Sequence, residues 1–111
     1  MMEAKFESVG PGRFRVSGPM TFVTVTGLLR QSADRFAHGE RAEVDLAQVE
    51  ESDSAGLALL IEWKKIARRQ GGSVRFINMP PQLTALARIS EVDELLSEEP
   101  ASAKPVERAA G

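Results

Sequence analysis

One stretch of the chain constrains the fold more than any other, because it places a strand, a polar loop and a helix start in immediate succession. A β-type run at Val44–Asp45–Leu46 leads to Asp53–Ser54 and then to an apolar helix. Both Asp53 and Ser54 are good N-caps, since a side-chain oxygen can accept from an unpaired amide of the first turn. Gly56 lies inside that turn, where glycine costs about 1 kcal/mol relative to alanine. Its presence predicts a close approach by another backbone or by a partner, so this corner is the candidate site.

Size and composition restrict the class of protein. The chain has 111 residues, 42% hydrophobic and 27% charged, which is typical of one ordinary soluble domain. No apolar run approaches the roughly 20 residues that a membrane-spanning helix needs, and the start lacks a signal-peptide profile. There is no cysteine, and the net charge of −2 gives no general attraction to nucleic acid. We therefore expect a cytoplasmic protein without nucleic-acid partners.

The chain contains no constellation that indicates an enzyme. His38 is the only histidine. Ala37–His38–Gly39–Glu40 is typical of a helix end followed by a turn, where the positive charge of a histidine interacts favourably with the helix dipole. No phosphate-binding Gly-x-x-x-x-Gly-Lys loop is present, and the acidic residues match no calcium-loop spacing. Asp45 and Asp53 are interpreted as a strand end and a helix cap rather than an acid–base pair. We expect no catalytic residue, no metal and no cofactor.

The first half of the chain alternates between strand and helix patterns. Lys5–Val9 and Arg13–Ser17 alternate apolar and polar residues around Gly10–Pro11–Gly12, which predicts a β-hairpin. The β-branched run Phe22–Thr26 favours a strand locally. A helix from about Thr21 to Ala37 is preferred, because one set of apolar residues falls at helical spacing: Phe22, Val25, Leu29, Ala33 and Phe36.

The second half repeats the strand–helix order. We expect a strand over Ala42–Leu46, a helix from the corner to Gln70 that ends at Gly71–Gly72, and a strand over Ser73–Ile77. A short helix with an apolar stripe follows, and a last apolar group closes the domain. The stripe is Leu83, Leu86, Ala87 and Ile89, and the closing group is Val92, Leu95 and Leu96. Ser97–Gly111 has no periodicity and is expected to be a loose tail after a domain spanning residues 5–96. The order β-β-α-β-α-β-α predicts a single α/β domain with a mixed sheet flanked by helices.

The helix that follows the corner has two unlike halves. Leu57–Ile61 is apolar nearly all round, which is typical of a helix buried on all sides or of one whose outer side is covered by another protein. Further along, Lys64, Lys65, Arg68 and Arg69 form a basic stripe. A solvated face near the helix C-terminus is the preferred interpretation, with a membrane surface or an acidic partner second.

The stretch from Val44-Asp45-Leu46 to Asp53-Ser54-Ala55-Gly56-Leu57, followed by Gln70-Gly71-Gly72 and Val74-Arg75-Phe76-Ile77, resembles the STAS domain. The resemblance covers nearly all of residues 5–96 and implies a mixed sheet with helices on one side. In STAS-type anti-sigma factor antagonists that are phosphorylated, a hydroxyl residue stands immediately before the glycine. Here that position is Ala55, which has no oxygen to accept a phosphate.

The Asp-Ser-small-Gly-Leu-Ala-Leu-Leu corner is more similar to the MlaB-type subunits of Mla phospholipid transporters. This resemblance implies a non-enzymatic cytoplasmic subunit that binds the ABC ATPase, lies at the inner membrane only through the complex, and supports outer-membrane lipid asymmetry in a Gram-negative cell. The hydroxyl residue at the ATPase contact of that family corresponds to Ser54, whose other role would be a plain N-cap. The alternative is an anti-sigma factor antagonist that binds an anti-sigma kinase. The expected partner-binding residues are Asp53, Ser54, Ala55, Gly56, Leu57, Ala58 and Ile61.

Overall fold

A mixed sheet of four strands forms the centre of the computed structural model, which describes residues 3–92 and 96. The strands stand side by side in chain order; β1 pairs antiparallel with β2, whereas β3 lies parallel to both β2 and β4. The predicted α/β class and the order β-β-α-β-α-β-α are confirmed. The elements are β1 (Lys5–Gly10), β2 (Arg13–Met20), α1 (Val25–Ser32), β3 (Arg41–Ser52), α2 (Ser54–Arg69), β4 (Ser73–Ile77) and α3 (Pro81–Ile89).

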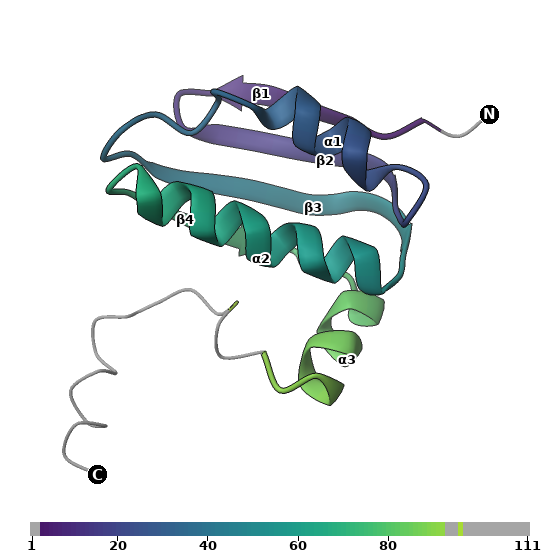
Figure 1. Cartoon of the computed structure of the whole chain (residues 1–111). Coiled ribbons are helices and arrows are strands. Elements are labelled where there is room, and N and C mark those ends of the chain that lie inside the picture. The colour runs from purple at the N-terminus through teal and green to yellow at the C-terminus, as the bar shows by residue number, and fades with distance from the viewer. Residues whose placement is uncertain (1–2, 93–95, 97–111) are drawn as a thin grey trace, which may run out of the picture.

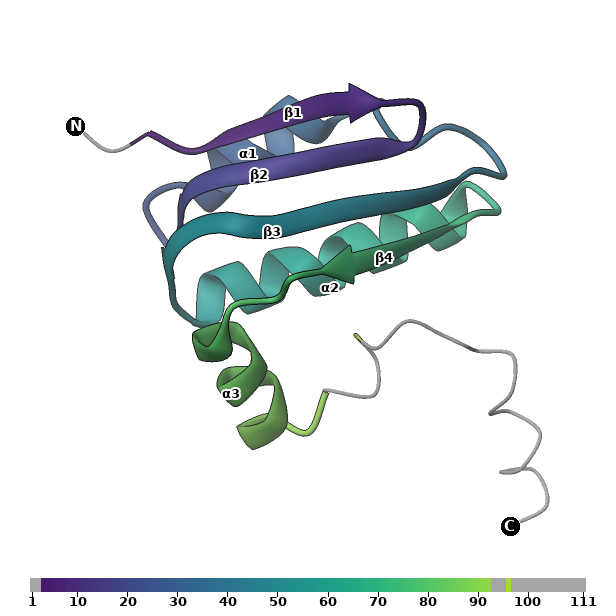
Figure 2. The ribbon, with the colours of Figure 1, turned by 180° about the vertical axis from the view of Figure 1, so that it is seen from behind.

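The helices α1 and α2 cover one face of the sheet, and the opposite face is bare (Figures 1 and 2). Strand alternation explains the difference, because successive side chains of a strand point to opposite faces. In β3, Ala42, Val44 and Leu46 are buried under the helices. On the bare face, Glu43 meets Arg13 at 3.9 Å and Arg75 at 3.1 Å. The bare face is therefore a charged surface suited to water.

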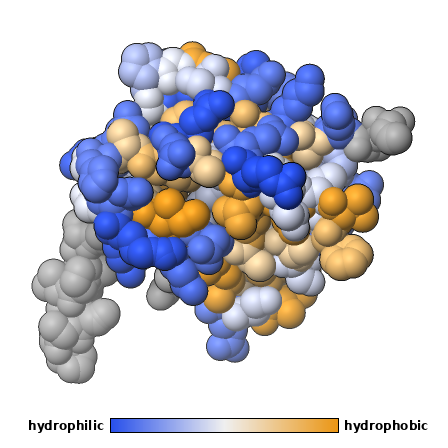
Figure 3. All heavy atoms as spheres, turned by 45° about the horizontal axis from the view of Figure 1, so that its top comes forward, coloured by the Kyte–Doolittle hydropathy of each residue, from blue (hydrophilic) through white to orange (hydrophobic). Residues whose placement is uncertain are grey.

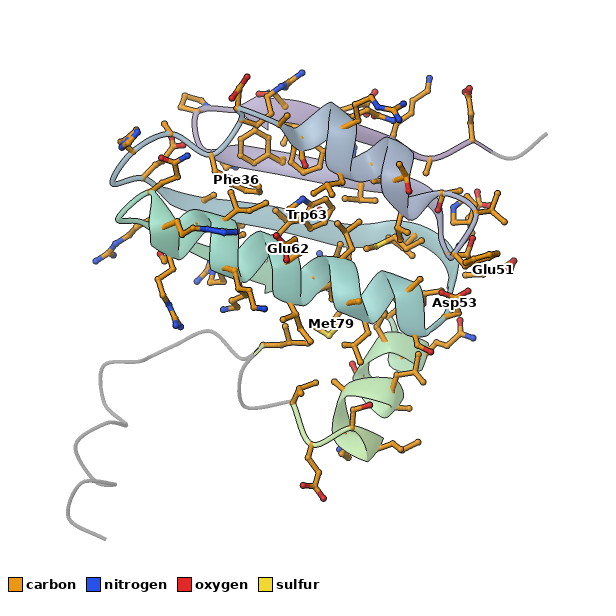
Figure 4. The ribbon with its side chains drawn as sticks, in the orientation of Figure 1. Phe36, Glu51, Asp53, Glu62, Trp63 and Met79 are labelled. Carbon is orange, nitrogen blue, oxygen red and sulfur yellow. The ribbon has the colours of Figure 1, made fainter. Side chains whose placement is uncertain are left out.

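The core is centred on Trp63, the only tryptophan of the chain, whose side chain is completely buried. Its ring lies 5.2 Å from that of Phe6 and 6.4 Å from those of Phe36 and Phe76, between α2 and the sheet (Figure 4). The indole N–H donates to the Ser32 hydroxyl at 2.8 Å. This bond satisfies a buried polar group and joins α1 to α2.

The first helix is shorter than the sequence pattern predicts, and its buried face is different. Residues 21–24 form a turn, and α1 ends where Asp34 takes a left-handed conformation with φ of 65°. Leu28 and Ser32 face the core, whereas Phe22 is 76% exposed and Leu29 is 38% exposed. The predicted stripe was therefore wrong at Phe22, Leu29 and Ala33, whereas Val25 packs against the core and Phe36 is buried beyond the end of the helix. His38 lies in a turn beyond the helix rather than at its end.

The third strand is longer than the predicted Ala42–Leu46. It continues to Ser52 because the second half of β2 pairs with it, at Ser17–Gln48, Gly18–Val49 and Met20–Ser52. Two register shifts interrupt this pairing, and they disturb the apolar–polar alternation that would have revealed the strand. The polar loop expected before Asp53 is thus a strand.

The ends of α2 agree with the sequence. Gly71 has φ of +77°, its N–H donates to the Arg68 carbonyl, and the N–H of Gly72 donates to the Ala67 carbonyl. This pair of bonds is a Schellman motif, in which a left-handed residue ends the helix and satisfies its last carbonyls. None of the helices within residues 3–92 is long and apolar enough to cross a membrane.

The last elements depart from the pattern at one residue. Leu83 and Ala87 of α3 are buried and Leu86 is half-buried, as the stripe predicts. Ile89 is 78% exposed, so its place in the stripe was wrong. Leu96 is buried in the core, while Leu95 and the expected tail over 97–111 lie outside the described residues.

Candidate partner-binding corner

Asp53 connects three parts of the fold at the end of β3 (Figure 4). It is the N-cap of α2, and its Oδ1 accepts from the amides of Ala55 at 2.9 Å and Gly56 at 3.4 Å. The other carboxylate oxygen, Oδ2, accepts from the amide of Phe22 at 3.1 Å. One side chain therefore holds both the first turn of α2 and the turn between β2 and α1.

Gly56 is required by the fold itself. A Cβ at this position would lie 2.4 Å from the carbonyl oxygen of Met20, at the end of β2. The amide of Asp53 donates to the same oxygen at 3.3 Å. The close approach that the glycine predicted is therefore made by the backbone of the same chain, and it fixes α2 against β2.

Ser54 is exposed at the first helical position, and the cap is Asp53 rather than Ser54. Ala58 is exposed one turn later, and Ile61 is half-buried. These three residues follow one another at i, i+4 and i+7, so they share one helix face. The corner thus presents a hydroxyl, a small apolar side chain and part of a larger one on the same helix face.

Two members of the predicted site are placed further inside. Ala55 is half-buried, and Leu57 is only 6% exposed because it belongs to the core. Leu59 and Leu60 are also buried, between the sheet and the neighbouring helices. The apolar character of this half of α2 is therefore explained by burial within the domain.

Two exposed apolar residues beside the corner are not among the predicted site residues. Phe22 and Val23 lie in the turn before α1 and are 76% and 81% exposed. Orange side chains gather at the right-hand edge of Figure 3, where this turn lies. The sequence carried no signal that separated them from core residues, because Phe22 also falls at helical spacing with the apolar residues that follow it.

Asp45 and Asp53 do not form a carboxylate pair. They lie eight positions apart, Asp45 inside β3 rather than at its end and Asp53 just after it, which corresponds to roughly 25 Å at the usual rise per residue. Asp45 accepts from the Asn78 side-chain amide and from the Ala47 N–H, both at 2.9 Å. These bonds, together with the Arg15 guanidinium, hold the pKa of Asp45 below its ordinary value by stabilising the carboxylate. Residues 3–92 contain no group of three or more side chains that could hold a metal ion.

The basic stripe lies in the second half of α2, away from the corner. Arg69 contacts Glu62 at 3.5 Å, and Lys64 lies over the Phe76 ring at 5.8 Å from its centroid. Lys65 and Arg68 are exposed to water. These positions agree with a solvated helix face.

The fold and the corner define a STAS domain, and comparison with known families agrees. The family model described as "Mlab, STAS domain" matches residues 7–97. The chain therefore belongs to this MlaB-type STAS family.

Among solved structures, the chain is similar to the murine Solute Carrier 26 family member A9 (Slc26a9) anion transporter in its inward-facing state. The TM-score is 0.62 at 17% sequence identity, over 78% of this chain and 15% of that chain. This likeness shows the fold alone, because the sequence identity is low. The chain spans only a small part of the transporter. No curated protein matches the chain.

Proposed function

We propose that this chain is a non-enzymatic subunit that binds the ABC ATPase of an Mla-type phospholipid transporter. It would support the assembly or activity of the complex, and thereby outer-membrane lipid asymmetry. In this proposal the chain stays at the cytoplasmic side of the inner membrane through its partner, without inserting itself. The observation that carries the proposal is the exposed Ser54 beside Gly56 in a chain of MlaB type.

The geometry of the corner supports a protein contact at Ser54. The residue is exposed, and Asp53 already provides the helix cap, so the Ser54 hydroxyl is not needed for capping. Small neighbours at Ala55 and Ala58 allow a partner surface to come close to the helix. Such a contact combines one hydroxyl that can donate and accept with close packing.

Ala55 separates this proposal from the alternative of an anti-sigma factor antagonist. The residue immediately before Gly56 has no hydroxyl, so a phospho-switch of the usual pattern has no acceptor there. A kinase of the anti-sigma type could still bind without phosphorylating. The two proposals therefore differ in the partner that is recovered.

The test is to purify the tagged full chain from its native membranes, as wild type and as Ser54→Glu. An ABC ATPase and a permease should accompany the wild type and be absent from Ser54→Glu. A carboxylate in the first helical turn is favoured by the helix dipole, so the variant should melt at or slightly above the wild-type temperature. The loss of partner would then reflect the contact rather than the fold.

Ser73→Glu provides a matched control, because Ser73 is an exposed serine at the start of β4 and distant from the corner. This variant should keep both partners. Recovery of a soluble kinase without a permease would overturn the transporter proposal and favour the signalling alternative.

A further inference from the structure

The turn between β2 and α1 exposes two adjacent large apolar side chains. Phe22 is 76% exposed and Val23 is 81% exposed. Single exposed apolar residues are common on protein surfaces and need no explanation. An adjacent pair that includes an aromatic ring is different, because aromatic side chains bury large areas at interfaces and are enriched there.

This turn is held in one shape. Thr24 Oγ1 donates to the Pro19 carbonyl at 2.8 Å and accepts from the Thr21 amide at 2.9 Å. Thr21 Oγ1 accepts from the Val23 amide at 3.3 Å, and Asp53 accepts from the Phe22 amide. The apolar pair is therefore presented on an ordered support, which reduces the entropy that binding would remove.

The same hydrogen bonds make the turn continuous with the corner. Asp53 holds the turn through Oδ2 and the first turn of α2 through Oδ1. The Asp53 amide also donates to the carbonyl of Met20, the residue just before the turn. Ser54 and the apolar pair consequently lie on the two sides of one carboxylate. The turn and the first turn of α2 are therefore neighbours across Asp53.

The charge around the turn indicates which kind of partner it fits. Glu50 and Glu51 are exposed on the strand that leads to Asp53. The segments 16–29 and 47–61 contain no Lys, Arg or His. An anionic phospholipid surface would be repelled by such a rim, because membrane-binding surfaces combine apolar residues with basic ones. A protein surface with an apolar pocket bordered by Lys or Arg is complementary in both respects.

We infer that Phe22 and Val23 form the apolar anchor of the docking surface and enter an apolar pocket with a basic rim on the ATPase. This inference rests on the proposed function and adds a second element, the β2–α1 turn, to the α2 corner. Asp53 is a positioning residue that keeps the anchor and Ser54 in register.

The test is the affinity of the purified full chain for the purified ATPase, measured by calorimetry. The double variant Phe22→Ser/Val23→Ser should weaken binding at least roughly tenfold, as is usual when an interface anchor is truncated. Ile89→Ser is the matched control, because Ile89 is 78% exposed at the end of α3 and its substitution should leave the affinity unchanged. All three substituted positions are exposed, so unchanged melting temperatures are expected.

The outcomes separate the inference from the proposed function. If Ser54→Glu abolishes binding while Phe22→Ser/Val23→Ser binds as the wild type, the function stands and the inference is overturned. If the wild type does not bind the ATPase, both fail. Co-sedimentation with phosphatidylethanolamine–phosphatidylglycerol vesicles that disappears in the double variant, with ATPase affinity retained, would overturn the protein pocket in favour of a lipid surface.

Discussion

At the scale of single residues, Asp53 has two separable functions because its two oxygens bind different elements. Oδ1 caps α2, and Oδ2 holds the β2–α1 turn through the Phe22 amide. Asp53→Asn keeps an acceptor for the cap, since asparagine caps about as well as aspartate, but it replaces one oxygen with an NH₂ group. We expect the helix start to persist while the turn becomes mobile.

The measurement is the backbone ¹⁵N order parameter. That of Phe22 should fall from a rigid value near 0.85 toward about 0.6, while those of Ala55 and Gly56 stay unchanged. Asp53→Ala should loosen both regions and lower the stability by about 1 kcal/mol through loss of the cap. Equal loosening at Phe22 and Gly56 in Asp53→Asn would contradict the division of roles.

At the scale of elements, the contact between α2 and β2 depends on a missing side chain. Alanine is the better helix former by about 1 kcal/mol, yet a Cβ at Gly56 would lie 2.4 Å from the Met20 carbonyl oxygen. Gly56→Ala must therefore push α2 away from the sheet, and we expect a net loss of roughly 1–2 kcal/mol as in other overpacked sites. Unfolding by urea can be followed through the fluorescence of Trp63, the only tryptophan.

Gly27 in α1 is the matched control for this prediction. It also lies inside a helix, but a Cβ there would meet nothing within 4 Å. Gly27→Ala should therefore raise the free energy of unfolding by up to about 1 kcal/mol. If both substitutions stabilise the protein, the contact at Met20 is not tight.

The elements also show which part of the structure the sequence could predict. The Asp-Ser-small-Gly order correctly predicted a cap and a close approach at the start of α2, because the cap is local and the glycine itself marks the approach, although its partner Met20 is distant in the sequence. The choice of which face of α1 is buried depends instead on a distant contact, the hydrogen bond from Trp63 to Ser32. Local periodicity fitted the stripe from Phe22 equally well, so the exposed Phe22 was mistaken for a core residue.

The length of β3 was missed for a related reason. Its second half is defined by pairing with β2 across register shifts, and that pairing leaves no regular alternation in the sequence. Long-range pairing therefore decided the element that positions Asp53. The class of fold was predictable, whereas the surface beside the site required the structure.

At the scale of the whole molecule, the charges are divided between the two ends of α2. Glu50, Glu51 and Asp53 lie by its N-terminus, and Arg68 and Arg69 lie in its last turn. A partner with a basic rim would be attracted to the acidic end, so the association rate should depend on ionic strength. Exposed charges are screened over about 8 Å at physiological salt, which makes this dependence measurable.

The prediction compares Glu50→Gln/Glu51→Gln with Arg68→Gln/Arg69→Gln in stopped-flow binding to the ATPase between low and high salt. The first variant should associate more slowly than the wild type at low salt and show a weaker salt dependence, with little change in the dissociation rate. The second removes two charges from the opposite end and should keep the wild-type slope. Both variants change exposed side chains, so neither should alter the fold. If the salt dependence is lost in the arginine variant instead, the partner binds at the basic end of α2 and away from the corner.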